Sequence, residues 1–202
     1  MLSSQLVAGR VLHVNTELPE EEAVTAVSSV IETGGTVIYP SDTVYGIIAD
    51  YRNRAACETV AEIKGYKAIR PFIILIPDIA SALTLTTGAH RGKYMQLHWP
   101  GPVTLVFKAS SAVPEWLVSS SGTVALRQPA HRLTAAIMKA TGRFLITTSA
   151  NRRGEPFPLD ILAINSHMVN SVDLTLNAGQ LMLRRPSRIL DCTGSMPVEV
   201  RN

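Results

Sequence analysis

Apolar residues recur at helical spacing in several segments of the chain. In the clearest one, Ala23, Val27 and Ile31 fall on one face of a helix. The acidic run Glu20–Glu22 precedes them, where the helix dipole favours negative charge, and Gly34–Gly35 ends the segment. Similar signals predict further helices at Ala56–Ile63, after Asp78, and at Arg91–Trp99, Leu133–Ala140 and Asp160–His167.

Apolar runs of strand length alternate with these helices. Phe72–Ile76 is continuously apolar, which is typical of a strand covered on both faces of a sheet. The alternation indicates an α/β fold with about eight strands. No linker or repeat divides the chain, so we expect residues 1–202 to form a single domain. The other predicted strands are Thr36–Tyr39, Val44–Asp50, Val103–Phe107, Thr123–Arg127, Phe144–Thr147, Val172–Leu176, Arg188–Asp191 and Val198–Arg201.

The composition excludes several classes of protein. The chain has 202 residues, of which 46% are hydrophobic and 17% charged, so it is not a disordered polyelectrolyte. A net charge of +3 permits an anionic partner without requiring one. Cys57 and Cys192 form no disulfide framework, which favours a reducing cytoplasm and inert thiols. No secretory signal and no apolar run of membrane-spanning length is visible, so we expect no contact with a membrane.

Several common catalytic motifs are missing. The chain has no phosphate-binding P-loop, no dinucleotide-binding glycine fingerprint and no nucleophile elbow of the α/β-hydrolases. Its five histidines share no ligand spacing with cysteine or aspartate. A resident metal site or a serine–histidine triad is therefore not expected.

Polar residues instead gather beside the predicted strands. Tyr39–Gly46 places the Ser41 and Thr43 hydroxyls on a tight loop, which is either a ligand site or only a local turn. Ile63–Pro71 contains three cations between a helix and a strand. They are either dipole complements of the helix end or a cationic rim for phosphates.

Two further clusters lie at strand ends. Arg127 ends an apolar strand and needs a partner there, either a ligand carboxylate or a structural acid. Thr147–Asn151 gathers hydroxyls and an amide at the carboxyl end of a strand, where open α/β sheets bind ligands. A helix cap is the alternative. We favour a functional role because the cluster is dense and the basic Arg152–Gly154 follows it.

These clusters belong to six motifs in order along the chain. They are PSDTVYG at Pro40–Gly46, IKG at Ile63–Gly65 with Pro71, WPGPVT at Trp99–Thr104, VALRQP at Val124–Pro129, TSANRRG at Thr148–Gly154 and PSRILD at Pro186–Asp191. In this set the chain resembles the YrdC-type family, the threonylcarbamoyl-AMP synthases, from about Glu22 to Arg201.

The resemblance implies a twisted mixed β-sheet flanked by helices around a large basic concave cleft. It also implies formation of threonylcarbamoyl-AMP and pyrophosphate from L-threonine, bicarbonate or CO2, and ATP, for threonylcarbamoyladenosine modification of tRNA. By position, the residues that would surround threonine are Thr43, Arg127, Thr147 and Ser187, with Arg127 pairing its carboxylate. Those that would hold ATP are Lys64, Arg70, Thr123, Ser149, Asn151 and Arg201, and Lys64 and Arg70 would also be catalytic.

The implied chemistry needs no protein nucleophile, because a carbamate oxygen of the substrate attacks the α-phosphorus. Positioning and charge neutralisation would provide the catalysis. Mg²⁺ is expected with ATP, held by few protein ligands. The implied partners are the machinery that transfers the threonylcarbamoyl group to tRNA, and tRNA or double-stranded RNA itself. A cytoplasmic location follows.

Besides Arg188, which stands where the family has threonine, three positions depart from the family pattern. Tyr66 stands where the family usually has arginine, Lys67 where it usually has proline, and Leu75 where a histidine often touches threonine. Lys67 or Arg70 could replace the missing cation. Two alternatives to the synthase therefore remain open. One is a weakly active or inactive YrdC/YciO-type paralogue that binds RNA or nucleotide, and the other is a transferase for a different small amine or carboxylate.

Overall fold

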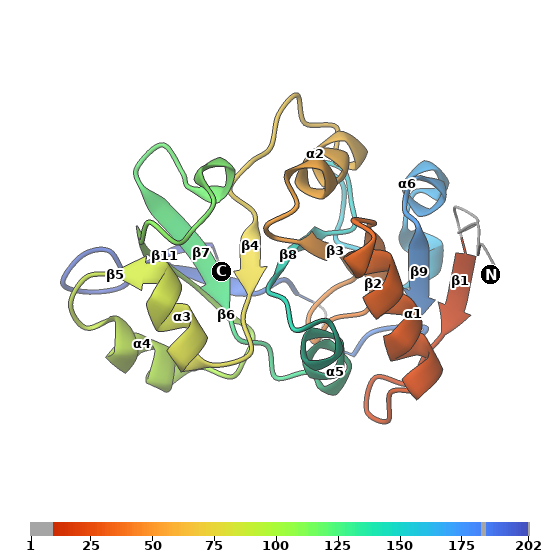
Figure 1. Ribbon diagram of the computed structural model, residues 1–202, viewed down its shortest axis with the longest axis horizontal. Coiled ribbons are helices and arrows are strands. Elements are labelled where there is room, and N and C mark those ends of the chain that lie inside the picture. The colour runs from red at the N-terminus through yellow and green to blue at the C-terminus, as the bar shows by residue number, and fades with distance from the viewer. Residues whose placement is uncertain (1–9, 183–184, 202) are drawn as a thin grey trace.

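The computed structural model describes residues 10–182 and 185–201, the last of these by its backbone alone. These residues form one mixed, eleven-stranded sheet with helices packed against it (Figure 1). The strand order is β1-β9-β2-β3-β8-β4-β7-β6-β10-β11, and β5 pairs with β6 beside this path. The strands are β1 (Arg10–His13), β2 (Val37–Tyr39), β3 (Gly46–Asp50), β4 (Ile73–Leu75), β5 (Thr86–Thr87), β6 (Val103–Ala109), β7 (Thr123–Arg127), β8 (Leu145–Ser149), β9 (Leu174–Asn177), β10 (Arg188–Asp191) and β11 (Val198–Arg201).

Helices cover both faces of the sheet, as the continuous apolar strands predict. The helices are α1 (Glu21–Glu32), α2 (Arg54–Ile63), α3 (Ile79–Leu85), α4 (Arg91–His98), α5 (Arg132–Thr141) and α6 (Ser166–Ser171), with 3-10 turns η1 (Glu115–Leu117) and η2 (Ile161–Ala163). Helices α1 and α5 lie together over one face (Figure 1). Neighbouring residues of β4 show the division, because Leu75 packs in the core beneath α1 and α5 while Ile74 packs in the core of the other face.

All predicted elements but one agree with the structure in type and, within a few residues, in extent. The predicted apolar face of α1 is buried, as the residues Ala23, Val27 and Ile31 show. Asp78 caps α3 by accepting a hydrogen bond from the Ser81 backbone N–H at 2.7 Å.

One predicted element is wrong, and short ones were not predicted. The segment Asp160–His167 is not one helix but part of η2 and α6. Asp160 and Asn165 each accept a backbone N–H two residues further on, so each begins a separate turn. The edge strand β1, the short strand β5 and the turn η1 follow no clear apolar pattern.

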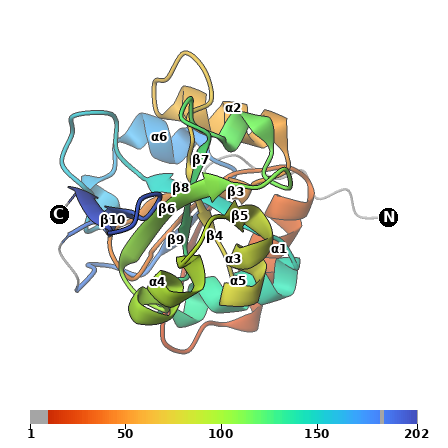
Figure 2. The same cartoon turned by 90° about the vertical axis from the view of Figure 1, so that its left-hand side faces the viewer.

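The C-terminal strands complete one end of the sheet (Figure 2). Strand β10 runs parallel to β6, so that Arg188 pairs with Val103, and β11 returns antiparallel to β10. This pairing brings Ser187, which directly precedes β10, beside β6. In the described part of the chain, no helix is long and apolar enough to cross a bilayer.

Candidate active site

A cavity of about 250 Å³ opens over the sheet face that also packs against α1 and α5. Four strand ends meet there, because Tyr39 pairs with Gly46, Gly46 with Ser149, and Ile73 with Thr147. Gly46 permits this convergence. A Cβ at that position would lie 3.0 Å from the Tyr39 ring and 3.1 Å from the Thr148 carbonyl oxygen.

Most of the predicted site residues line this cavity. They are Thr43, Arg70, Arg127, Thr147, Ser149 and Ser187. Lys64 and Asn151 are buried behind the wall that Ser149 forms. Thr123 begins β7, at the opposite end from Arg127, and its hydroxyl bonds to the Ser119 hydroxyl at 2.7 Å. It does not line the cavity. Arg201 belongs to β11, but its side chain lies outside the described residues.

Arg127 lies buried at the floor of the cavity with partners on three sides. Its Nη2 lies 2.6 Å from Asp42 Oδ1, an ion pair without the alignment of a hydrogen bond. Its Nε donates to the Gly101 carbonyl at 3.1 Å and its Nη1 to the Thr43 hydroxyl at 3.3 Å. Of the two predicted kinds of partner, the structure contains the structural acid. Asp42 neutralises the buried guanidinium, a role that the sequence motif alone did not assign to it.

Hydroxyl groups fix the walls on either side of Arg127. The Ser41 hydroxyl accepts hydrogen bonds from the backbone N–H groups of Thr43 and Val44, at 3.1 and 3.2 Å, and so holds a turn that presents Thr43 to the guanidinium. The Tyr39 hydroxyl lies 3.3 Å from that of Thr147. Burial raises the pKa of Tyr39 to about 12, so its phenol remains neutral at physiological pH.

Lys64 supports the Ser149–Asn151 segment from behind. Its ammonium donates to the carbonyl oxygens of Ser149, at 2.7 Å, and of Asn151. The Asn151 side chain accepts from the Ser149 hydroxyl at 2.5 Å and donates to the Glu155 carbonyl at 2.7 Å. Burial lowers the pKa of Lys64 to about 8, and the nearby Glu155 carboxylate partly opposes this. Lys64 therefore directs its charge at the protein's own carbonyls, and its contact with ATP stays a prediction.

The segment Trp99–Thr104 holds the floor in place, although no function was predicted for it. The Trp99 indole donates to the Val103 carbonyl at 2.7 Å, and the Gly101 carbonyl accepts from Arg127. The buried Thr104 hydroxyl lies 2.9 Å from that of Ser187. The sequence does contain one sign of this role, because Thr104 is a polar residue within the otherwise apolar start of strand β6.

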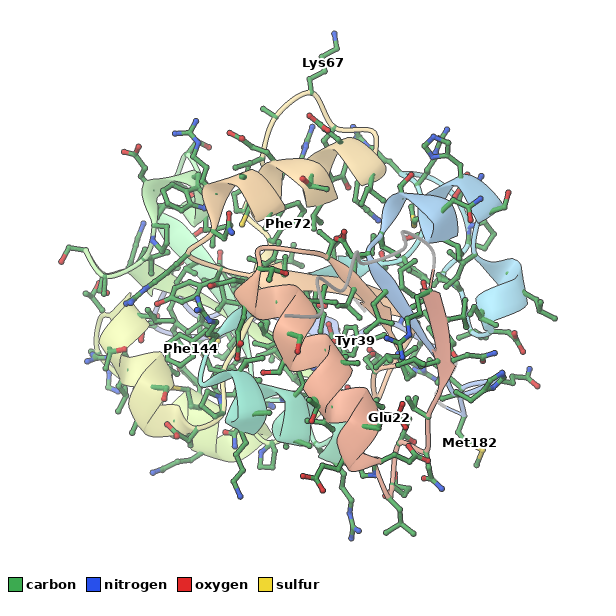
Figure 3. The ribbon with its side chains drawn as sticks, turned by 45° about the vertical axis from the view of Figure 1, so that its right-hand side comes forward. Glu22, Tyr39, Lys67, Phe72, Phe144 and Met182 are labelled. Carbon is green, nitrogen blue, oxygen red and sulfur yellow. The ribbon has the colours of Figure 1, made fainter. Side chains whose placement is uncertain are left out.

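The three departures from the family pattern occupy different environments. Arg70 lies at the cavity rim, with its guanidinium 5.0 Å from the centre of the Tyr66 ring. Lys67 is exposed and points away from the molecule at the tip of its loop (Figure 3). Arg70 is thus the residue of this loop that brings a cation to the cavity. Leu75 is fully buried beneath α1 and α5 and does not line the cavity.

Among the described residues, neither cysteine is a reactive thiolate. Cys57 and Cys192 are buried free thiols, and burial raises the pKa of each to about 11, so neither is a thiolate near neutral pH. Within residues 10–182 and 185–200, no group of three or more histidine, cysteine or acidic side chains could hold a metal ion. The polar side chains that line the cavity are arginines and hydroxyl-bearing residues.

Comparison with protein families identifies this arrangement. The model of the Sua5_yciO_yrdC family, described as "Telomere recombination", matches residues 29–202. The chain belongs to the Sua5/YciO/YrdC family. The matched range contains every strand end that borders the cavity.

Known members of the Sua5/YciO/YrdC family resemble the chain over most of its length. The threonylcarbamoyl-AMP synthase of Nitrosococcus oceani is 33% identical over 165 residues, which cover 80% of this chain and 89% of that protein. The crystal structure of P. abyssi Sua5 complexed with L-threonine matches with a TM-score of 0.83 and 28% identity, covering 95% of this chain and 56% of that one. The chain thus spans just over half of the P. abyssi protein. E. coli YciO matches with a TM-score of 0.84 at 22% identity, over 96% of this chain and 95% of that one, and confirms the predicted fold.

Proposed function

We propose that this protein is a threonylcarbamoyl-AMP synthase, which forms threonylcarbamoyl-AMP and pyrophosphate from L-threonine, bicarbonate or CO2, and ATP. One observation supports this above all. Arg127 with Thr43, and Arg70 with Ser149, border the same cavity. An amino acid and a nucleotide could therefore be held next to each other. The relatives named threonylcarbamoyl-AMP synthase support the same activity.

The floor of the cavity suits the amino acid. The Arg127 guanidinium has more N–H groups than its three protein partners use, so the remaining ones can bind a carboxylate. Hydroxyls for the other polar groups of the amino acid come from Thr43, Thr147 and Ser187. A volume of about 250 Å³ is small for a whole nucleotide. We therefore place threonine inside the cavity. ATP extends out of the cavity past Arg70, with its phosphates between Arg70 and Ser149.

The reaction in this arrangement proceeds in two steps. The threonine amine attacks CO2 and loses a proton, which gives a carbamate. A carbamate oxygen then attacks the α-phosphorus of ATP while the bond to the β-phosphate bridging oxygen breaks, and pyrophosphate leaves. Alignment of the two reactants can supply about 7–11 kcal/mol of barrier reduction. The protein's part is to orient the reactants and to neutralise phosphate charge.

In this proposal Mg²⁺ binds together with ATP. The cavity wall offers hydroxyl oxygens, whereas the nearby carboxylate of Asp42 is paired with Arg127. Such a site suits an ion that is held mainly by phosphates and water. The ion would neutralise charge on the phosphates during attack.

The direct test is an assay of purified protein with threonine, bicarbonate, Mg²⁺ and ATP. We expect threonine-dependent pyrophosphate release and a new adenylate. Arg127→Ala should raise the KM for threonine more than that for ATP, and Ser149→Ala should do the reverse. No product under conditions in which a known synthase is active would reject the proposal, and equal effects of both variants would reject the division of roles.

The identity of the amino acid needs its own control. A thermal-shift screen of amino acids with ATP present measures which one stabilises the folded state. We expect threonine to give the largest shift. A larger shift with another amine would favour a different transferase.

We also propose that the same protein binds tRNA or double-stranded RNA. Arg152 and Arg153 are exposed directly after the Ser149–Asn151 segment. Contacts of this kind to phosphates weaken steeply with salt. A tRNA affinity that does not change between low and physiological salt would argue against it.

A further inference from the structure

The rim of the cavity is built on the end of helix α2. Gly65, at φ +75°, ends this helix in a Schellman motif, in which the Gly65 N–H donates to the Glu62 carbonyl and the Tyr66 N–H to the Ala61 carbonyl, both at 2.8 Å. The Tyr66 ring also packs against the hydrophobic core. The backbone and the ring of Tyr66 are therefore fixed before any ligand arrives.

Arg70, in contrast, is exposed and is held by little except this ring. Its guanidinium lies 5.0 Å from the ring centre, within the range of a cation–π contact. Among the described residues, no carboxylate pairs with it and no hydrogen bond uses its donors. Arg54, which stacks on Trp116, differs in that Glu58 pairs with it at 3.0 Å. The Arg70 donors therefore stay available at the rim.

We propose that Tyr66 is a positioning residue that holds Arg70 as the anion-binding arm of the cavity, and that its ligand is the triphosphate of the nucleotide. A guanidinium held over an aromatic ring contributes its positive charge to that contact and not its N–H donors, so the donors can bind phosphate oxygens. This inference rests on the proposed function, since it names the part of ATP that crosses the rim. The inference gives Tyr66, which stands where the family usually has arginine, a function in orienting Arg70.

Three variants test the pair. Tyr66→Leu removes the ring, Tyr66→Phe keeps the ring and removes only the hydroxyl, and Arg70→Gln removes the cation. We expect Tyr66→Leu to raise the KM for ATP about fivefold, as for loss of a cation–π contact, and Arg70→Gln to raise it more. Tyr66→Phe should keep the wild-type value. The KM for threonine should stay unchanged in all three.

A matched control is available on the surface. Arg52 stacks on Tyr51 at 5.3 Å and does not line the cavity, so Arg52→Gln removes the same charge from the same kind of contact. It should leave the KM for ATP unchanged. A wild-type KM for ATP in Tyr66→Leu would overturn the inference, and so would equal increases of both KM values.

Calorimetric titration of Mg²⁺–pyrophosphate, without threonine, separates this inference from the proposed function. Weaker binding to Tyr66→Leu and Arg70→Gln, with normal binding to Tyr66→Phe and Arg52→Gln, supports the anion-binding arm even if no adenylate is formed. Equal binding to all variants overturns it even if the enzyme is active. A thermal unfolding scan of each variant confirms that the protein titrated is folded.

Discussion

Two arginines line the same cavity and are held in opposite ways. Arg127 is buried at the floor, between an acid, a carbonyl and a hydroxyl from distant parts of the chain. Arg70 is exposed at the rim and rests on one ring four residues before it. The arginine at the floor is therefore held by the folded core, whereas the arginine at the rim brings positive charge to the cavity from an exposed position.

This difference accounts for two of the three departures from the family pattern, whereas the third, Leu75, is buried in the core beneath α1 and α5. The floor motifs around Asp42, Gly101 and Arg127 match the family pattern, and each contributes a partner that a buried charge needs. Tyr66 and Lys67 depart from it in the rim loop, where Tyr66 is only half-buried and Lys67 is exposed, so that solvent replaces a lost contact at lower cost than at the floor. Substitutions should therefore reduce stability at the floor and change only ligand binding at the rim.

The largest effect on stability is expected from breaking the floor ion pair. Asp42→Asn leaves Arg127 without its counter-charge, and loss of one partner of a buried pair costs about 3 kcal/mol or more. Urea unfolding measures the change. Glu17→Gln is the matched control, because it breaks an exposed pair with Arg132 at 3.7 Å and should cost about 0.5 kcal/mol or less. Equal losses in the two variants would contradict the contrast.

Removal of the Lys64 ammonium should have a smaller effect. Lys64→Met leaves the acceptors of Ser149 and Asn151 unpaired and should cost about 2 kcal/mol. Lys108→Met is the control, since its exposed ammonium contacts the single carbonyl of Ser121 at 3.1 Å. That variant should unfold at nearly the wild-type urea concentration.

The Lys64 pKa also gives this effect a pH dependence. Burial lowers its pKa to about 8 from an unfolded value near 10.5, so the unfolded state binds more protons between these values. The free energy of unfolding of the wild type therefore rises through this window relative to Lys64→Met. Urea unfolding of both proteins at pH 7.5 and pH 10 measures the gap. A gap that shrinks with pH would show that the lysine is held more strongly as the charged form.

Loss of the Thr104 hydroxyl should cost about 1 kcal/mol, because it removes one buried hydrogen bond to Ser187. Thr104→Val keeps the shape of the side chain, and Thr104→Ser keeps the hydroxyl. We expect Thr104→Val to raise the KM for threonine while Thr104→Ser restores it. A raised KM in both would indicate that packing, not the hydrogen bond, positions Ser187.

The smallest effect on stability is expected at the rim. Arg70→Gln should change the free energy of unfolding by less than about 0.5 kcal/mol, as for other exposed side chains. Its effect should instead be on ATP binding. Thermal unfolding without ligand measures the difference, and a loss as large as that of Asp42→Asn would place Arg70 in the core network.

The sequence predicted the residues of the cavity better than their roles. Strand ends were visible as apolar runs that stop at Tyr39, Arg127 and Thr147, and their convergence follows from sheet pairing. The partners of Arg127 were not predictable, because Asp42 and Gly101 reach it only through the tertiary fold. The inward direction of the Lys64 side chain was not predictable either, since a cation at a helix end usually faces solvent.

The most direct test of the account is whether threonine and nucleotide share one cavity. Calorimetry can measure threonine binding with and without saturating α,β-methylene-ATP, which cannot release pyrophosphate, and then the reverse titration. We predict that each ligand tightens the other at least about fivefold, and by the same factor, because the two lie in contact in the proposed arrangement and coupling is reciprocal. Affinities that do not depend on the other ligand would contradict the shared cavity.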